Sequence, residues 1–95
     1  MSPQTLHDQV YDAAIACVTG DGQFGEEWLF QAKLALTSQF RTIPPQPLDP
    51  TIFNAFLKSS QIRGTAMRLF WDDLTSDEER GHLKLEKAVQ TAMRL

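Results

Sequence analysis

Two side chains near the C-terminal end have the spacing of a metal-binding pair. Glu79 and His82 are three residues apart, so on a helix they project from the same face. Helical di-iron carboxylate proteins use such a pair from each of two helices, together with two further glutamates. This chain has one pair, so the hypothesis requires a metal-binding dimer in which Glu26 or Glu27 supplies the missing carboxylates. The simpler interpretation is that Glu79 belongs to a helix N-terminus, and we predict no cofactor.

The single cysteine is the other residue with reactive chemistry. Cys17 would need a histidine base within hydrogen-bonding distance to act as a nucleophile, and His7 is ten residues away along the chain. Cys17 also stands between Ala16 and Val18 on the apolar side of its segment. This setting is typical of a small buried thiol. Because no other arrangement of residues suggests catalysis, we expect that the protein is not an enzyme.

A helix-turn-helix for DNA binding is a second hypothesis. It uses the helices predicted over residues 50–62 and 65–74, with a hinge at 59–64 and with Arg63, Thr65 and Arg68 facing the nucleic acid. Asp72 opposes this interpretation, because it lies on the same helix and repels phosphate. The chain also has nine basic and twelve acidic residues and a net charge of −3, whereas binding to phosphates relies on a basic surface. We therefore expect nucleic acid to be the less favoured partner.

Apolar residues are unusually abundant between residues 25 and 41. They include Trp28, Phe30 and Leu34 and cover nearly the whole circumference of the predicted helix. A helix that is apolar all round is buried on several sides, so it is either central to the domain or shared with a second chain. We take Trp28, Phe30 and Leu34 as the candidate contacts with a protein partner, which includes a second copy in a homodimer.

The elements that position these residues are all predicted to be helices. Helical spacing of apolar residues predicts helices over 3–19, 25–41, 50–62 and 65–74 and from Ser76 to the C-terminus. Asp49 followed by Pro50 predicts a capped helix start, and Ser76 with Glu79 predicts a capping box. Gly64 is expected to separate the third and fourth helices. No segment has the alternation typical of a strand, so the expected fold is all-α, a compact bundle of four to five helices around a central helix at 25–41.

Length and composition indicate one domain in a reducing compartment. The 95 residues suffice for a single core, which we divide into halves 1–41 and 49–95 joined by a proline-rich connector, 42–48. One cysteine and a polar N-terminus without a signal peptide favour the cytoplasm. The expected function is a small intracellular protein–protein interaction module of the adaptor, regulator or inhibitor type, a profile typical of phage and plasmid proteins. The DNA-binding regulator and the dimeric metal-binding protein are the alternatives.

Overall fold

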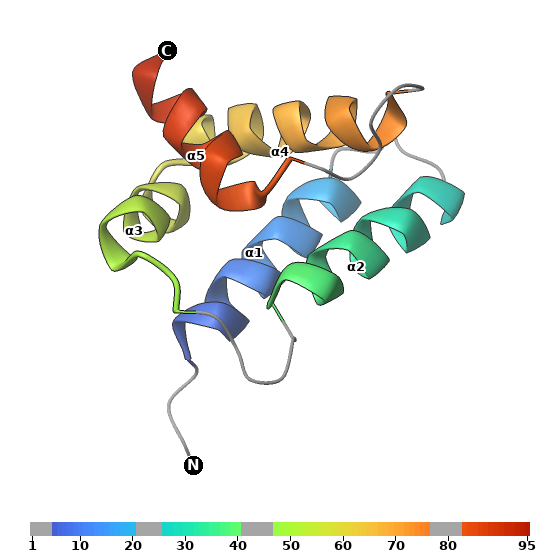
Figure 1. Ribbon diagram of the computed structural model, residues 1–95, viewed down its shortest axis with the longest axis horizontal. Coiled ribbons are helices and arrows are strands. Elements are labelled where there is room, and N and C mark those ends of the chain that lie inside the picture. The colour runs from blue at the N-terminus through green and yellow to red at the C-terminus, as the bar shows by residue number, and fades with distance from the viewer. Residues whose placement is uncertain (1–4, 21–25, 41–46, 77–82) are drawn as a thin grey trace.

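Five helices account for most of the chain. The computed structural model describes residues 5–20, 26–40, 47–76 and 83–95, with the side chain of residue 28 left aside. The helices are α1 (Leu6–Gly20), α2 (Glu26–Phe40), α3 (Pro50–Lys58), α4 (Ser60–Thr75) and α5 (Leu85–Arg94) (Figure 1). No strand occurs within these ranges. The Cα radius of gyration of 12.7 Å is close to the roughly 13 Å expected for a compact domain of about 100 residues, which confirms the all-α bundle.

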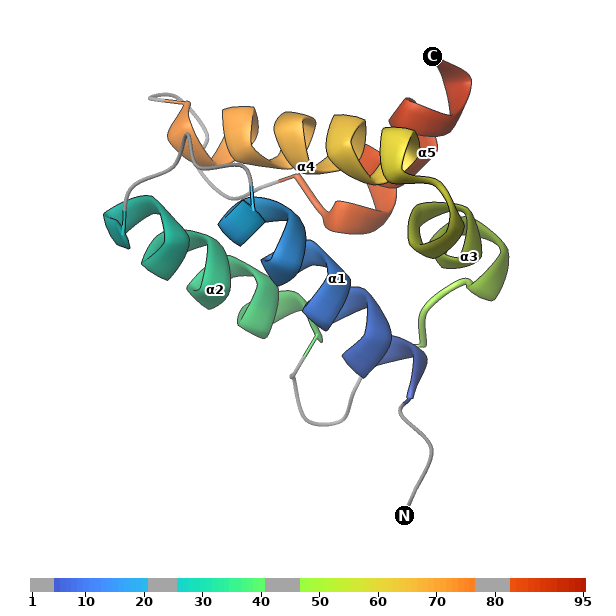
Figure 2. The same ribbon diagram turned by 180° about the vertical axis from the view of Figure 1, so that it is seen from behind.

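α1 is one of the three helices, with α3 and α4, that each have three helical neighbours. It packs against α2, α3 and α4, and α5 packs against α3 and α4. Seen from behind in Figure 2, α1 lies between α2 and α3, and α4 crosses beyond its C-terminal end. The expectation that the second helix is central is therefore wrong, because α2 lies at the edge and packs mainly against α1. The buried row of α1 is Val10, Ala14 and Val18, and such small side chains allow neighbouring helices to approach closely.

The core is built around large side chains from four helices. Phe53, Phe56, Phe70, Leu36 and Leu85 are among the largest fully buried residues. Phe40 at the end of α2 packs edge-to-face on Phe53 of α3, with ring centroids 6.2 Å apart, a favourable arrangement for aromatic pairs. This contact joins the two predicted halves into one core, although residues 42–46 of the connector lie outside the described residues.

The joint between α3 and α4 differs from the prediction. It is the single residue Ser59, whose hydroxyl accepts a hydrogen bond from the Ile62 amide at 3.2 Å, and Gly64 lies inside α4. A serine cap satisfies an amide at the start of a helix, whereas a glycine within a helix costs only about 1 kcal/mol. The serine cap therefore places the boundary between α3 and α4 at Ser59. The predicted start at Asp49 and Pro50 is confirmed, because the Asp49 carboxylate accepts from the Thr51 amide at 2.9 Å.

The last helix also starts later than predicted. Ser76 ends α4, and its amide donates to the Asp73 carbonyl. α5 begins at Leu85, after non-helical Leu83 and Lys84. Contacts distant in sequence fix this start: the Gln39 side chain of α2 accepts from the Leu85 amide at 2.9 Å and donates to the Leu83 carbonyl at 3.4 Å. The capping box predicted at Ser76 is a local sequence signal. It does not reveal contacts with residues far along the chain.

Candidate functional site

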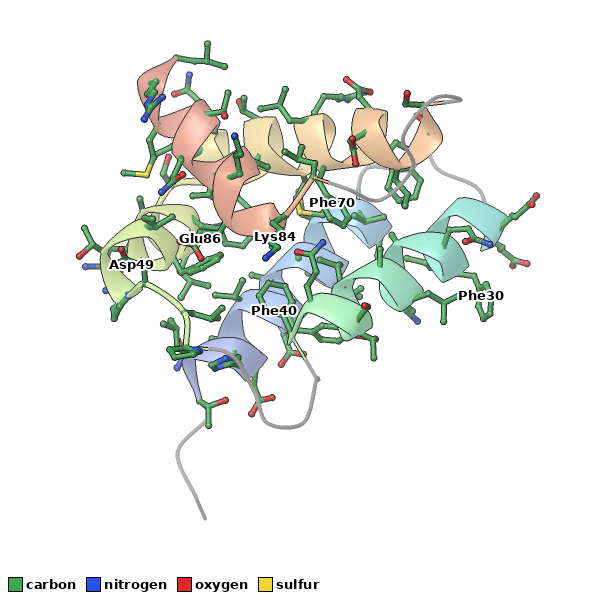
Figure 3. The ribbon with its side chains drawn as sticks, viewed as in Figure 1. Phe30, Phe40, Asp49, Phe70, Lys84 and Glu86 are labelled. Carbon is green, nitrogen blue, oxygen red and sulfur yellow. The ribbon has the colours of Figure 1, made fainter. Side chains whose placement is uncertain are left out.

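The outer face of α2 carries the most exposed apolar pair within a helix. Phe30 is 59% exposed and Leu34 is 52% exposed. They are four residues apart, so they lie one turn apart on one face. Figure 3 shows Phe30 projecting from α2 away from the other helices. The sequence prediction named both residues, and the structure places them together at the surface.

The opposite face of α2 explains why this pair stays outside. Ala32, Leu36 and Phe40 are buried; α2 packs mainly against α1, and Phe40 at its end contacts Phe53 of α3. A single neighbouring helix covers one row of side chains, so the second apolar row of α2 remains in contact with solvent. Trp28 belongs to the same helix, but its side chain lies outside the described residues.

Polar side chains surround the apolar pair. The exposed residues of α2 around Phe30 and Leu34 are Glu26, Glu27, Gln31, Lys33, Thr37 and Ser38. An apolar centre with a polar rim is the usual composition of a protein–protein interface. The other large exposed apolar residues in the described part of the chain, Met93 and Leu95, belong to its last three residues. They do not form part of this surface.

The three residues proposed to face DNA have different roles in the structure. The Arg63 guanidinium donates from Nη1 to the carbonyls of Phe56 and Leu57 at 2.9 and 3.0 Å. It thus satisfies carbonyls at the end of α3, which have no partner within that helix. Thr65 is half-buried and Arg68 is exposed. A one-residue joint also replaces the hinge expected at 59–64, so the local geometry differs from the one that the DNA-binding hypothesis assumed.

Cys17 lies beside two hollows in the surface. It is half-buried and packs against the core, so it is less covered than the buried thiol expected from the sequence. The hollows have volumes of about 440 and 500 Å³, and both are lined by Cys17 of α1 and Ser60 of α4.

The proposed metal pair, Glu79 and His82, lies outside the described residues. Glu26 and Glu27 are exposed in the first turn of α2. Within the described ranges, no group of three or more histidine, cysteine or acidic residues is arranged to hold a metal ion. Among the helices that the structure describes, none is long and apolar enough to cross a membrane.

Sequence reasoning missed the polar contacts that join distant elements. Gln39 connects α2 to the start of α5, and the Asp73 carboxylate accepts from the Leu83 amide at 2.9 Å. No local signal marks either residue, because their partners are many residues away along the chain.

In comparisons with protein-family models, curated proteins and solved structures, nothing matches this chain. The functional argument therefore rests on the described side chains.

Proposed function

We propose that the chain is a small intracellular protein–protein interaction module that associates through the outer face of α2. The observation that carries this proposal is the exposure of Phe30 and Leu34 one turn apart. Large apolar side chains grouped at a surface mark contact sites. Burying a pair of this kind removes apolar area from water, at roughly 25 cal/mol per Å².

The partner that fits this face best is a second copy of the chain. In an antiparallel crossing of two α2 helices centred near Ala32, Phe30 of each copy faces Leu34 of the other. Glu27 then faces the neutral Thr37 of the other copy, so no like charges meet. A parallel crossing brings Glu26 and Glu27 of both copies together, which is unfavourable. The face thus favours a two-fold symmetric dimer, in which the same patch serves on both subunits.

This dimer is expected to be weak. A stable interface buries about 1,200–2,000 Å² in total, and one face of one helix provides less than that. The association should therefore depend on protein concentration. This behaviour suits a regulator or adaptor that exchanges partners. The single cysteine of the chain agrees with the cytoplasm as the proposed location, where thiols stay reduced.

Two leucines of α2 provide a matched test. Leu34 is 52% exposed and Leu36 is fully buried, so the same substitution to glutamate separates association from folding. We expect Leu34→Glu to remain helical by circular dichroism and to sediment as a monomer at concentrations where the natural chain dimerises. Leu36→Glu should unfold, because it places a charge in the core.

An added charge on another face serves as the control. Gln90 is exposed on α5, and Gln90→Glu should leave both folding and dimerisation unchanged. A natural chain that stays monomeric at every concentration contradicts the proposal. A Leu34→Glu variant that still dimerises contradicts it equally, because the contact must then lie elsewhere.

A further inference from the structure

A small hollow lies where the end of α2 meets the start of α5. It has a volume of about 180 Å³. Its lining includes Phe40 of α2, Leu48 just before α3, Phe53 of α3, and Lys84 and Glu86 at the start of α5. Figure 3 shows Phe40 beside Lys84 and Glu86. We call this site the α2–α5 hollow.

The inner side of the hollow is apolar and well packed. Phe40 is 5% exposed and Phe53 is fully buried, and their edge-to-face contact fixes both rings. Pro47 and Leu48 add further apolar lining. An engineered apolar cavity of about 150 Å³ binds benzene. The α2–α5 hollow therefore has room for one apolar group of about the size of a phenyl ring.

Two side chains of opposite charge line the same hollow. Lys84 is exposed and Glu86 is half-buried. Within the part of the chain that the structure describes, neither forms an ion pair with the other or with a third residue. Each can therefore attract a group of opposite charge on a bound molecule. A few polar groups beside an apolar surface are typical of small-molecule sites, where they fix the orientation of the ligand.

Lysine at position 84 is unfavourable for the helix that it precedes. Lys84 is the N-cap of α5, and its side chain makes no capping hydrogen bond. Serine, threonine, aspartate and asparagine are preferred at an N-cap, and a positive charge is unfavourable near a helix N-terminus. The stability of α5 therefore does not account for this lysine. Residues that break a local rule of stability are expected at functional sites.

Contacts from other elements hold the backbone around Lys84. Gln39, which also lines the hollow, accepts from the Leu85 amide and donates to the Leu83 carbonyl, on either side of Lys84. The Asp73 carboxylate accepts from the Leu83 amide. A site that is already ordered before its ligand arrives loses less conformational entropy on binding. The α2–α5 hollow is ordered in this sense.

We propose that the α2–α5 hollow binds a free apolar amino acid. The side chain of the amino acid lies against Phe40 and Phe53. Its carboxylate pairs with Lys84, and its ammonium group pairs with Glu86. A peptide segment of a partner protein fits the hollow less well, because amide groups replace both charges within a peptide chain.

Nuclear magnetic resonance titration with four probes tests the proposal. All four carry a phenyl ring: L-phenylalanine, 3-phenylpropionate without the ammonium group, phenethylamine without the carboxylate, and N-acetyl-L-phenylalaninamide without either charge. We expect L-phenylalanine to bind at least about threefold more tightly than each of the others, because every other probe lacks at least one ion pair. The shifted amide signals should include Phe40, Lys84 and Glu86.

Substitution of Lys84 separates binding from folding. Lys84→Ser introduces a preferred N-cap, so the variant should unfold at a higher temperature than the natural chain. It should nevertheless bind L-phenylalanine at least about threefold more weakly and no longer prefer it to phenethylamine. Glu86→Gln should likewise remove the preference for L-phenylalanine over 3-phenylpropionate. Lys87→Ser removes the same charge from an exposed position of α5 and should leave all four affinities unchanged.

Several outcomes would overturn this assignment. These are no saturable binding of L-phenylalanine, equal binding of the four probes, or affinity for L-phenylalanine that Lys84→Ser leaves unchanged. Tighter binding of the uncharged N-acetyl-L-phenylalaninamide would overturn it as well and would indicate a partner's peptide instead. The result is independent of the proposed dimer. The monomeric Leu34→Glu variant should bind L-phenylalanine as the natural chain does, so failure of one proposal does not imply failure of the other.

Discussion

The outer faces of α2 and α5 differ in composition. α5 buries Leu85, Ala88, Val89 and Ala92, and before the chain end its exposed positions are Lys87, Gln90 and Thr91. α2 likewise buries one row, but its outer face carries Phe30 and Leu34. Apart from Met93 near the chain end, which is 44% exposed, the apolar residues of α5 match the area that neighbouring helices cover. In α2 they exceed it.

The difference shows that apolar content alone does not predict burial. What counts is how many neighbours cover a helix: α5 packs on both α3 and α4, whereas α2 packs mainly on α1. An apolar row that no helix covers lowers the solubility of the protein. We infer that the second row of α2 serves association and that the outer face of α5 does not.

The largest expected effect comes from the buried rows. Leu36 of α2 and Leu85 of α5 are both fully buried, so replacement of either by alanine should lower the free energy of unfolding by about 2–5 kcal/mol. Leu34→Ala is the matched control and should change it by less than about 0.5 kcal/mol. Chemical denaturation at low protein concentration measures all three. A large loss for Leu34→Ala under these conditions would make the outer face of α2 part of the core and break the comparison.

A smaller effect is expected where α2 and α5 touch. Gln39→Ala removes the acceptor for the Leu85 amide and the donor to the Leu83 carbonyl. Leaving such partly buried groups unpaired should cost about 1–3 kcal/mol. Gln39→Glu keeps the acceptor oxygen and should lose less. Thermal unfolding of both variants, with Ser38→Ala as an exposed neighbour for control, checks this order. Equal stability of Gln39→Ala and Ser38→Ala would show that the start of α5 does not depend on α2.

The smallest effect on stability should come from making the outer face of α2 resemble that of α5. In the double variant Phe30→Gln and Leu34→Lys, polar side chains replace the exposed pair. The free energy of unfolding of the monomer should change by less than about 0.5 kcal/mol, as for most surface substitutions, while dimerisation is lost. Denaturation and sedimentation of the same sample measure both. A variant that dimerises like the natural chain would remove the functional difference between the two faces.

Local signals in the sequence predicted much of the secondary structure. Asp49 and Pro50 start α3 as expected, because a cap acts on amides two or three residues away. The helical period placed α1 and α2 to within a few residues. The predicted boundary at Gly64 is wrong, because the Ser59 cap starts α4 and the helix continues through Gly64. The start at Leu85 was missed because Gln39 and Asp73 act from far along the chain.

The candidate site could be predicted only in part. Periodicity indicated that α2 has more apolar residues than one contact needs, and Phe30 and Leu34 were named for that reason. It could not show which row α1 covers, since this depends on how the helices pack. The sequence does not indicate the two hollows beside Cys17, because their lining comes from three helices. Thr65 and Arg68, which the DNA-binding hypothesis uses, both line one of these hollows.

The most direct test of the α2 interface is the contact between two copies. A sample that mixes isotope-labelled and unlabelled chains reports only those nuclear Overhauser effects that cross from one chain to the other. The proposed antiparallel dimer predicts such effects between the Phe30 ring of one copy and the Leu34 methyl groups of the other, growing with protein concentration. Intermolecular effects confined to other residues, such as Met93 and Leu95, or their absence at high concentration, would contradict it.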